Sequence, residues 1–321
     1  MPWRFLAVLV CAACMLRPLP ASADPEKVSI GIYVGGIHNL DFSVGKFTAD
    51  FWIWSVVDED HASPLDTAYV LNEVGKSADP IFTVRKVGKR WDQRRIRADL
   101  WVDWEVERFP FDTQVLTITL EESVYTADQL GYVIDRMNSG IAPDLSIAGW
   151  SILGWDIRTE EASYASSFGD PANPNGTKFA RVVFSLKVHR AGLRTFLDQT
   201  IGAFVSFGVL ALSFRLLPIV PPIFGARMVI IVGAMFTATT SMRAFGSTYA
   251  FHFGETLPTR IYLLTLAAGF LAAFAAVIAR YIVERGNEAL ALRYDRWCLV
   301  ILTVAYVGMV SGEILHAVHF C

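Results

Sequence analysis

The chain contains 321 residues, of which 53% are hydrophobic and 18% are charged. Such a mixture is typical of a protein that is partly water-soluble and partly embedded in a membrane. The formal net charge of −3 gives no electrostatic basis for binding nucleic acid, so we expect no nucleic-acid partner.

Residues 1–23 are predicted to form a secretory signal peptide. Arg4 precedes an apolar run at residues 5–16, and Ala21-Ser22-Ala23 supplies small residues for cleavage after Ala23. An uncleaved membrane span is the alternative, but this apolar run is shorter than the roughly 20 residues that a membrane helix needs. We therefore expect an exported domain that begins at residue 24.

Residues 24–190 are predicted to form an extracellular or periplasmic antiparallel β-sandwich. Apolar side chains alternate with smaller or polar ones from Val28 to Val34 and, over eleven residues, from Ile96 to Val106. The alternation returns at 116–120 and 180–188. A period of two indicates half-buried antiparallel strands. Many such strands with short polar turns, and no convincing helical period between them, favour a sandwich.

Residues 191–321 are predicted to form a transmembrane domain of four helices, at about 193–217, 226–250, 260–283 and 297–320. The prolines between Leu217 and Pro222 should end the first span. Arginines concentrate near the first and third connections, at positions 215, 227, 285, 293 and 296. Basic residues favour the cytoplasmic side, so both the N-terminal domain and the C-terminus should face outward.

The second span is the most polar of the four. Its polar side chains are Thr237, Thr239, Thr240, Ser241, Arg243, Ser247 and Thr248, whereas the neighbouring spans are much more apolar. Polar side chains inside a membrane normally face a bundle interior or a water-filled path. The span is therefore predicted to be a pore wall.

Five segments together resemble the pentameric ligand-gated ion channels, the Cys-loop receptor superfamily. They are Phe109-Pro110-Phe111-Asp112, the stretch 120–128, Gly149-Trp150, Arg190 and the stretch 221–228. The resemblance covers essentially the whole mature chain in the right order. It implies a β-sandwich above four helices, five copies around a central ion pore, and gating by an extracellular small molecule or by protons.

Two departures from the family pattern shape the expectation. The paired cysteines of the eukaryotic loop would fall at Val102 and Leu116, so the loop lacks its disulfide, as in bacterial members. Ser123 stands where many receptors have an aromatic residue for cationic amines. The resemblance thus implies a bacterial channel in the inner membrane, with its N-terminal domain in the periplasm, and it does not identify the ligand.

The resemblance also assigns gating and ligand-binding residues. Phe109, Pro110, Phe111, Asp112 and Arg190 would couple the sandwich to the first span, with Asp112 and Arg190 in contact; a plain surface-charge role is the alternative. Ligand-binding candidates are Trp54, Tyr125, Tyr164 and Phe168. Tyr164 and Phe168 lie in or beside the loop 165–177, where pocket lining is plausible. For Trp54 considered alone, core packing is the favoured interpretation.

Two registers of the second span remain open. The match at 221–228 directs Val229, Gly233, Phe236, Thr240, Arg243 and Ser247 to the axis, whereas the hydroxyl pattern favours Thr237, Thr240 or Ser241, Ala244 and Thr248, a face rotated by about 100°. We favour the first because the match is long. Phe236 would then be a hydrophobic gate. The positive charge of Arg243, together with the absence of a glutamate at the inner mouth, favours the passage of anions over cations.

The remaining chemistry-bearing pattern is Glu313, His316 and His319, which are spaced to share one helix face. This spacing could bind a transition metal if other ligands converged. Since no second cluster accompanies them, we predict polar residues at the membrane edge and no metal site.

No glycine-rich phosphate loop and no nucleophile elbow are present in the sequence, so we expect neither an enzyme nor a cofactor. The predicted function is a homopentameric ligand- or proton-gated ion channel that contacts membrane lipids. The alternative is a non-conducting membrane sensor with a periplasmic β-sandwich. The polar second span favours the channel, because a passive anchor does not need it.

Overall fold

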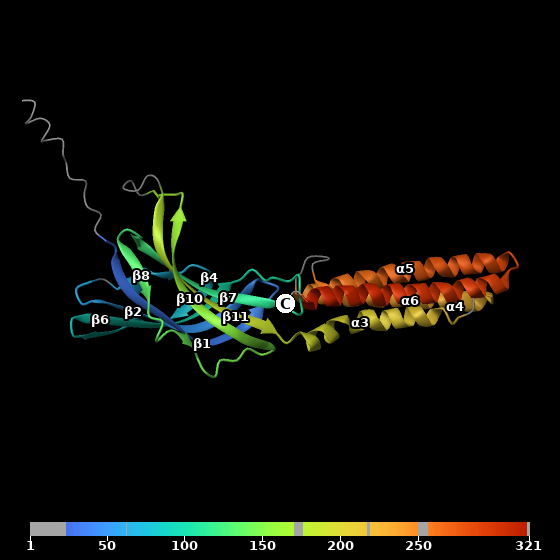
Figure 1. Ribbon diagram of the computed structural model, residues 1–321, viewed down its shortest axis with the longest axis horizontal. Coiled ribbons are helices and arrows are strands. Elements are labelled where there is room, and N and C mark those ends of the chain that lie inside the picture. The colour runs from blue at the N-terminus through green and yellow to red at the C-terminus, as the bar shows by residue number, and fades with distance from the viewer. Residues whose placement is uncertain (1–23, 62, 170–175, 217–218, 250–255, 320–321) are drawn as a thin grey trace, which may run out of the picture.

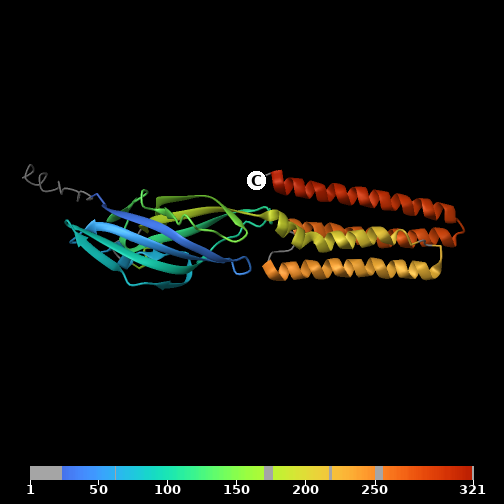
Figure 2. The same ribbon diagram turned by 90° about the horizontal axis from the view of Figure 1, so that it is seen from below.

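The computed structural model describes residues 24–61, 63–169, 176–216, 219–249 and 256–319. The strands lie between residues 26 and 190 and the four long helices between residues 192 and 319. The two parts are joined end to end in an elongated molecule, as Figures 1 and 2 show. The predicted signal peptide lies outside the described residues.

One sheet contains seven strands. They are β1 (Glu26–Asp41), β2 (Lys46–Asp58), β4 (Glu73–Ala78), β5 (Phe82–Lys86), β6 (Lys89–Trp101), β8 (Leu130–Ile134) and β9 (Gly140–Ile141). The main order is β4-β6-β2-β1-β8, with β5 paired to β6 and β9 to β1. The strands β8 and β9 run parallel to β1, so the prediction of a purely antiparallel sandwich is wrong at this edge. Neither strand follows β1 through a hairpin, which would have imposed the antiparallel direction.

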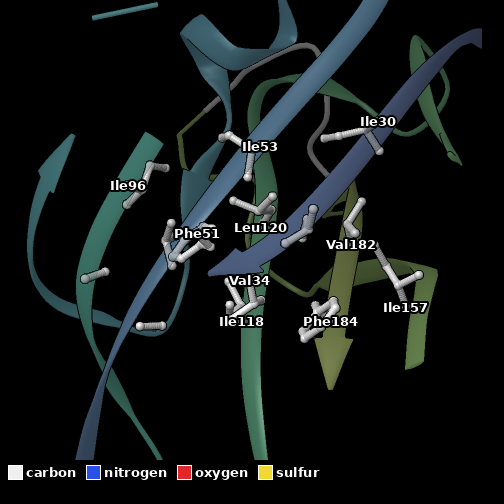
Figure 3. Packing of buried hydrophobic residues seen from close by; sticks show 14 of the residues in the cluster. Ile30, Val34, Phe51, Ile53, Ile96, Ile118, Leu120, Ile157, Val182 and Phe184 are labelled. Atoms are coloured by element: carbon white, nitrogen blue, oxygen red, sulfur yellow. The ribbon is translucent and has the colours of Figure 1, made fainter. Parts of the chain in front are cut away.

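The second sheet has the order β10-β11-β7-β3. Its strands are β3 (Tyr69–Val70), β7 (Thr113–Thr126), β10 (Trp150–Tyr164) and β11 (Thr177–Arg190), and a single helical turn, α2 (Pro64–Thr67), precedes β3. Side chains from both sheets meet in one hydrophobic core, where Figure 3 shows Phe51 and Ile30 facing Ile118 and Val182. The predicted sandwich is confirmed.

The longest alternating segment ends as a strand earlier than its pattern suggests. The strand β6 stops at Trp101, five residues before Val106. Beyond it, the Val102 amide donates to the Gly45 carbonyl at 2.9 Å, and the Trp104 indole donates to the Asp41 carbonyl at 3.0 Å. Alternating burial persists in this segment although the strand ladder does not, because the segment still lies along the end of the sandwich.

The four helices are α3 (Gly192–Ser213), α4 (Pro221–Tyr249), α5 (Leu257–Glu284) and α6 (Glu288–His319). All four are long and apolar enough to cross a membrane. The chain is therefore a multi-pass membrane protein with an N-terminal β-sandwich. The helix α5 packs against each of the other three, whereas α6 packs mainly against α5.

Three helix boundaries differ from their predicted positions. The helix α3 ends four residues before position 217, and α4 begins at Pro221, five residues before position 226. Proline is compatible with the first turn of a helix, where its missing N–H has no partner to lose. The helix α6 begins at Glu288, nine residues before position 297, because the Asn287 side chain accepts the Leu290 amide at 3.1 Å and caps an amphipathic extension.

Candidate functional site

The junction between sandwich and helices is held by a buried ion pair. Arg190, the last residue of β11, donates from Nε to Asp112 Oδ1 at 2.7 Å and from Nη2 to Oδ2 at 3.2 Å. Its backbone amide also donates to the Asp112 carbonyl at 3.1 Å. Asp112 is 1% exposed and Arg190 is 8% exposed. The predicted contact is present, and the surface-charge alternative is wrong.

Aromatic rings enclose the Arg190 guanidinium. Its carbon lies 4.2 Å from the centre of the Trp150 ring, 4.5 Å from Phe42 and 4.7 Å from Phe109. Ring faces attract cations, and the attraction strengthens when water is excluded. Gln114 completes the site by donating to Asp112 Oδ2 at 2.6 Å. Sequence reasoning missed Phe42 and Gln114, because neither belongs to a segment that carries the resemblance.

The segment 109–112 also contacts the helices. The Phe111 ring lies 5.7 Å from Phe196 of α3, and the Phe109 ring lies 5.7 Å from Phe245 of α4. A Cβ atom at Gly192 would lie 2.4 Å from the Pro110 carbonyl oxygen, so only glycine fits at the start of α3. The same loop therefore touches two helices and is fixed to the end of β11.

The helix α4 has one buried and one exposed face. Its buried residues are Arg227, Ile231, Ala234, Ala238 and Phe245. Its exposed residues include Val229, Gly233, Phe236, Thr240 and Arg243. At about 100° per residue, the second set is centred on the side opposite the first. The favoured pore register thus coincides with the face that points away from the chain's own bundle; the side chain of Ser247 lies outside the described residues.

The residues of the hydroxyl-rich register are not all on the exposed face of α4. Ser241 is partly buried, and a Cβ atom on Gly202 of α3 would lie 2.8 Å from its Oγ and 2.9 Å from the hydroxyl of Tyr262 in α5. Ser241 therefore lies at a helix–helix contact, whereas the residues of the favoured register lie on the exposed face. Thr237 is exposed beside Thr240.

Three threonine hydroxyls of α4 have partners within the helix. Thr237 donates to the Gly233 carbonyl at 3.0 Å, Thr239 to Met235 at 2.8 Å and Thr240 to Phe236 at 3.0 Å. Such back-bonding satisfies a hydroxyl without water. The polarity of this span is therefore weaker evidence for a water-filled path than the composition alone suggests.

A second cluster lies on the outer face of the four-stranded sheet, around Glu121. This carboxylate is 1% exposed and accepts from Tyr164 at 2.7 Å, Arg181 Nε at 2.8 Å and Tyr69 at 3.0 Å. Strand pairing places Arg181 beside Glu121 and Glu160, and Tyr69 on the other side of Glu121. The register of four strands, β3, β7, β11 and β10, thus assembles the cluster.

The electrostatics of this cluster raise the pKa values of its two tyrosines and its arginine. The pKa of Tyr69 is raised to about 12, mainly by burial and secondly by its hydrogen bond to Glu121. The same two causes raise the pKa of Tyr164. Burial lowers the pKa of Arg181, but its bond to Glu121 more than compensates and leaves that pKa raised. Neutral tyrosines and a charged arginine therefore surround the carboxylate.

Aromatic rings extend the cluster to the surface. Tyr164 lies 5.3 Å from Phe168 and 6.2 Å from Phe179, measured between ring centres. Phe168 is 65% exposed and has a φ of 51°, which is uncommon for a residue with a side chain. The structure brings the predicted Tyr164 and Phe168 together. Sequence reasoning missed Glu121, although it lies in the quoted stretch 120–128, and also missed Arg181 and Phe179.

The other two ligand-binding candidates lie elsewhere in the chain. Trp54 is on the seven-stranded sheet, 8% exposed, and its indole donates to Asp135 at 3.1 Å. It covers Gly31, where a Cβ atom would lie 2.1 Å from the ring. Trp54 thus packs on the outer face of its own sheet, outside the sandwich core, and is not adjacent to Tyr164 within one chain. Tyr125 is partly buried and packs against the core.

The irregular end of β7, which contains Tyr125, is fixed by a buried carboxylate. Glu122 accepts the backbone amides of three successive residues, 123 to 125, at 3.1 to 3.4 Å, and the Tyr132 hydroxyl at 3.0 Å.

Near the end of α6, Glu313 pairs with Arg260 at 3.2 Å. His316 is exposed, and the side chain of His319 lies outside the described residues.

Comparison of the chain with protein-family models gave no match, and comparison with curated proteins gave none either.

Proposed function

We propose that five copies of this chain form a ligand- or proton-gated ion channel in a bacterial inner membrane, with α4 lining the pore. The observation that carries the proposal is the exposed face of α4, which combines Phe236, Thr240 and Arg243 opposite a tightly packed seam. An arginine on a lipid-facing helix is unfavourable, by roughly 2.5–3.5 kcal/mol at the membrane centre and by less towards the helix end where Arg243 lies. A shared aqueous axis removes that cost.

One such helix cannot enclose a conduit alone, so the same face must be repeated around an axis. Closed rotational symmetry satisfies this requirement with identical chains. Five Phe236 rings would then form an apolar constriction that closes by dewetting, and five Arg243 side chains further out would favour anions. The arginines of the inner connections support a periplasmic N-terminal domain.

Gating would pass along β11. This strand carries Phe179 and Arg181 of the Glu121 cluster and ends at Arg190, immediately before α3. Nine residue steps of a strand span about 30 Å. A small molecule or proton that changes the cluster would act on the Asp112–Arg190 pair and, through Phe109 and Phe111, on α3 and α4. Trp54 of a neighbouring copy would complete the ligand site.

A non-conducting sensor is the second candidate. The observation that favours it is the back-bonding of Thr237, Thr239 and Thr240, which makes these hydroxyls compatible with a helix that faces no water. In that case the sandwich would sense a solute and signal through helix movement without a current.

Two measurements separate these functions. Native mass spectrometry in detergent should show five copies, and planar-bilayer recording against a panel of pH values and metabolites should show unitary currents. Pentamers with stimulus-dependent currents support the channel. A stable monomer or dimer would reject the channel, and a folded oligomer that binds a solute but passes no current would support the sensor.

A further inference from the structure

Arg227 has the largest side chain among the fully buried residues that the structure describes. It lies in the second turn of α4, two residues before Val229, at the end of the bundle farthest from the sandwich. Its Nη1 donates to Asp295 Oδ2 at 2.8 Å and its Nη2 to Oδ1 at 2.8 Å. Both side chains are at least 95% buried. Asp295 belongs to α6, so the pair joins the two helices.

A buried guanidinium persists only where its charge is compensated. The two-pronged bond to a carboxylate is the strongest arrangement for this, and the Phe214 ring of α3 covers the Arg227 guanidinium carbon at 4.6 Å. The remaining donor, Nε, is buried without a hydrogen-bond partner among the described residues. Asp295 therefore provides the main compensation for the buried charge.

The direction of Arg227 is the consequence that matters for conduction. It lies on the seam with Ile231 and Ala234, on the opposite side of α4 from Val229 and Phe236. A long basic side chain that loses its buried partner extends its charged end to the nearest water. For Arg227 that water is at the inner end of the bundle, next to the predicted entrance to the pore.

We infer that Asp295 is a positioning and selectivity-determining residue, which holds Arg227 inside each subunit and keeps five positive charges away from the inner entrance of the pore. This inference depends on the proposed channel function. It also gives α6 a role in fixing the rotation of α4, since no other ion pair between described residues joins these two helices.

The first test compares Asp295→Asn with Glu284→Gln as a matched control. Glu284 lies at the same end of the bundle and pairs with Arg280 at 3.0 Å, but its side chain is 57% exposed. Each variant removes one negative charge per subunit. In a salt gradient, Asp295→Asn should move the reversal potential towards the equilibrium potential of the anion. Glu284→Gln should leave the reversal potential at the wild-type value.

The second test does not require a current. Val229→Cys is labelled from the inner side with cationic and anionic methanethiosulfonates, and the two rates are measured by peptide mass spectrometry. Adding Asp295→Asn should lower the ratio of cationic to anionic labelling several-fold, because the released guanidinium repels the cationic reagent. An unchanged ratio, or an equal change with Glu284→Gln, would overturn the inference.

A double variant guards against a folding defect. Arg227→Met with Asp295→Leu replaces the pair by apolar side chains of similar volume, which is often tolerated in a protein interior. Because Arg227 is hidden in the wild type, the double variant should keep both the labelling ratio and the reversal potential. If the labelling ratio or the reversal potential of the double variant changes in favour of cations, Arg227 already acts at the pore in the wild type. That result rejects the inference. A wild type that conducts nothing rejects the channel instead.

Discussion

The two buried arginine–carboxylate pairs lie at opposite ends of the helices and differ in how completely they are satisfied. Arg190 has a carboxylate, three aromatic rings and a backbone bond to the same aspartate. Arg227 has a carboxylate and one ring, and its Nε has no partner among the described residues. The Asp112–Arg190 pair, here called the outer pair, connects two domains. The Arg227–Asp295 pair, here called the inner pair, connects two helices of one bundle. In the proposed channel, the same chemistry would transmit movement at one end and fix orientation at the other.

Disruption of the outer pair should have the largest effect. Arg190→Gln leaves Asp112 buried without a compensating charge, which costs about 3–5 kcal/mol in comparable cases. Stimulus-evoked current should disappear while pentamers still form, because the sandwich and the helices keep separate cores. Bilayer recording and native mass spectrometry measure the two outcomes. A double-mutant cycle with Asp112→Asn should show strong non-additivity; additive effects would contradict coupling through the pair.

Disruption of the inner pair should affect stability more than gating. Arg227→Met alone isolates the Asp295 carboxylate and should lower the thermal midpoint of the detergent-solubilised protein by several degrees. The double variant with Asp295→Leu should recover most of that loss, since it leaves no unpaired charge. Equal midpoints for the single and double variants would mean that the pair contributes nothing to the bundle.

The exposed face of α4 provides the contrast with both pairs, because changes there should alter conduction without unfolding. Phe236→Ser should wet the constriction and raise the resting leak current. Labelling of single cysteines should modify positions 236 and 240 but spare position 241. The reverse pattern would show that the hydroxyl-rich face lines the pore and that Phe236 is not the gate.

A smaller effect is expected from Arg243→Glu. The five substituted side chains would replace a positive field by a negative one. The reversal potential in a salt gradient should therefore move towards the equilibrium potential of the cation. Because Arg243 is exposed within its own chain, the thermal midpoint should stay close to the wild-type value. An unmoved reversal potential would place Arg243 away from the pore.

The smallest effect concerns Tyr69, whose pKa is raised to about 12 by burial and by Glu121. A raised pKa in the folded state stabilises the neutral form, so this contribution is complete below about pH 10 and is lost as the pH rises towards 12. Alkaline unfolding should therefore be less steep in Tyr69→Phe than in the wild type. Identical alkaline profiles would show that Tyr69 ionises normally.

The outer pair could be predicted from the sequence, whereas the inner pair could not. The segment 109–112 and Arg190 both belong to segments that carry the family resemblance, so their contact across 78 positions could be proposed. Asp295 lies in the amphipathic start of α6, which hydropathy assigned to a connection. Its pairing with Arg227 across 68 positions depends on how far α6 extends and which way it turns. Neither property is local.

The sequence by itself determined the two-part architecture, because period-two burial and long apolar runs are local consequences of strand and membrane-helix geometry. It also placed Phe236 and Arg243 on one helix face. Only the tertiary structure decided that β8 runs parallel to β1, that Glu121 is bound by Arg181, and that Arg227 turns inward. These features depend on strand order and helix packing, which bring together side chains whose separation along the chain carries no periodic signal.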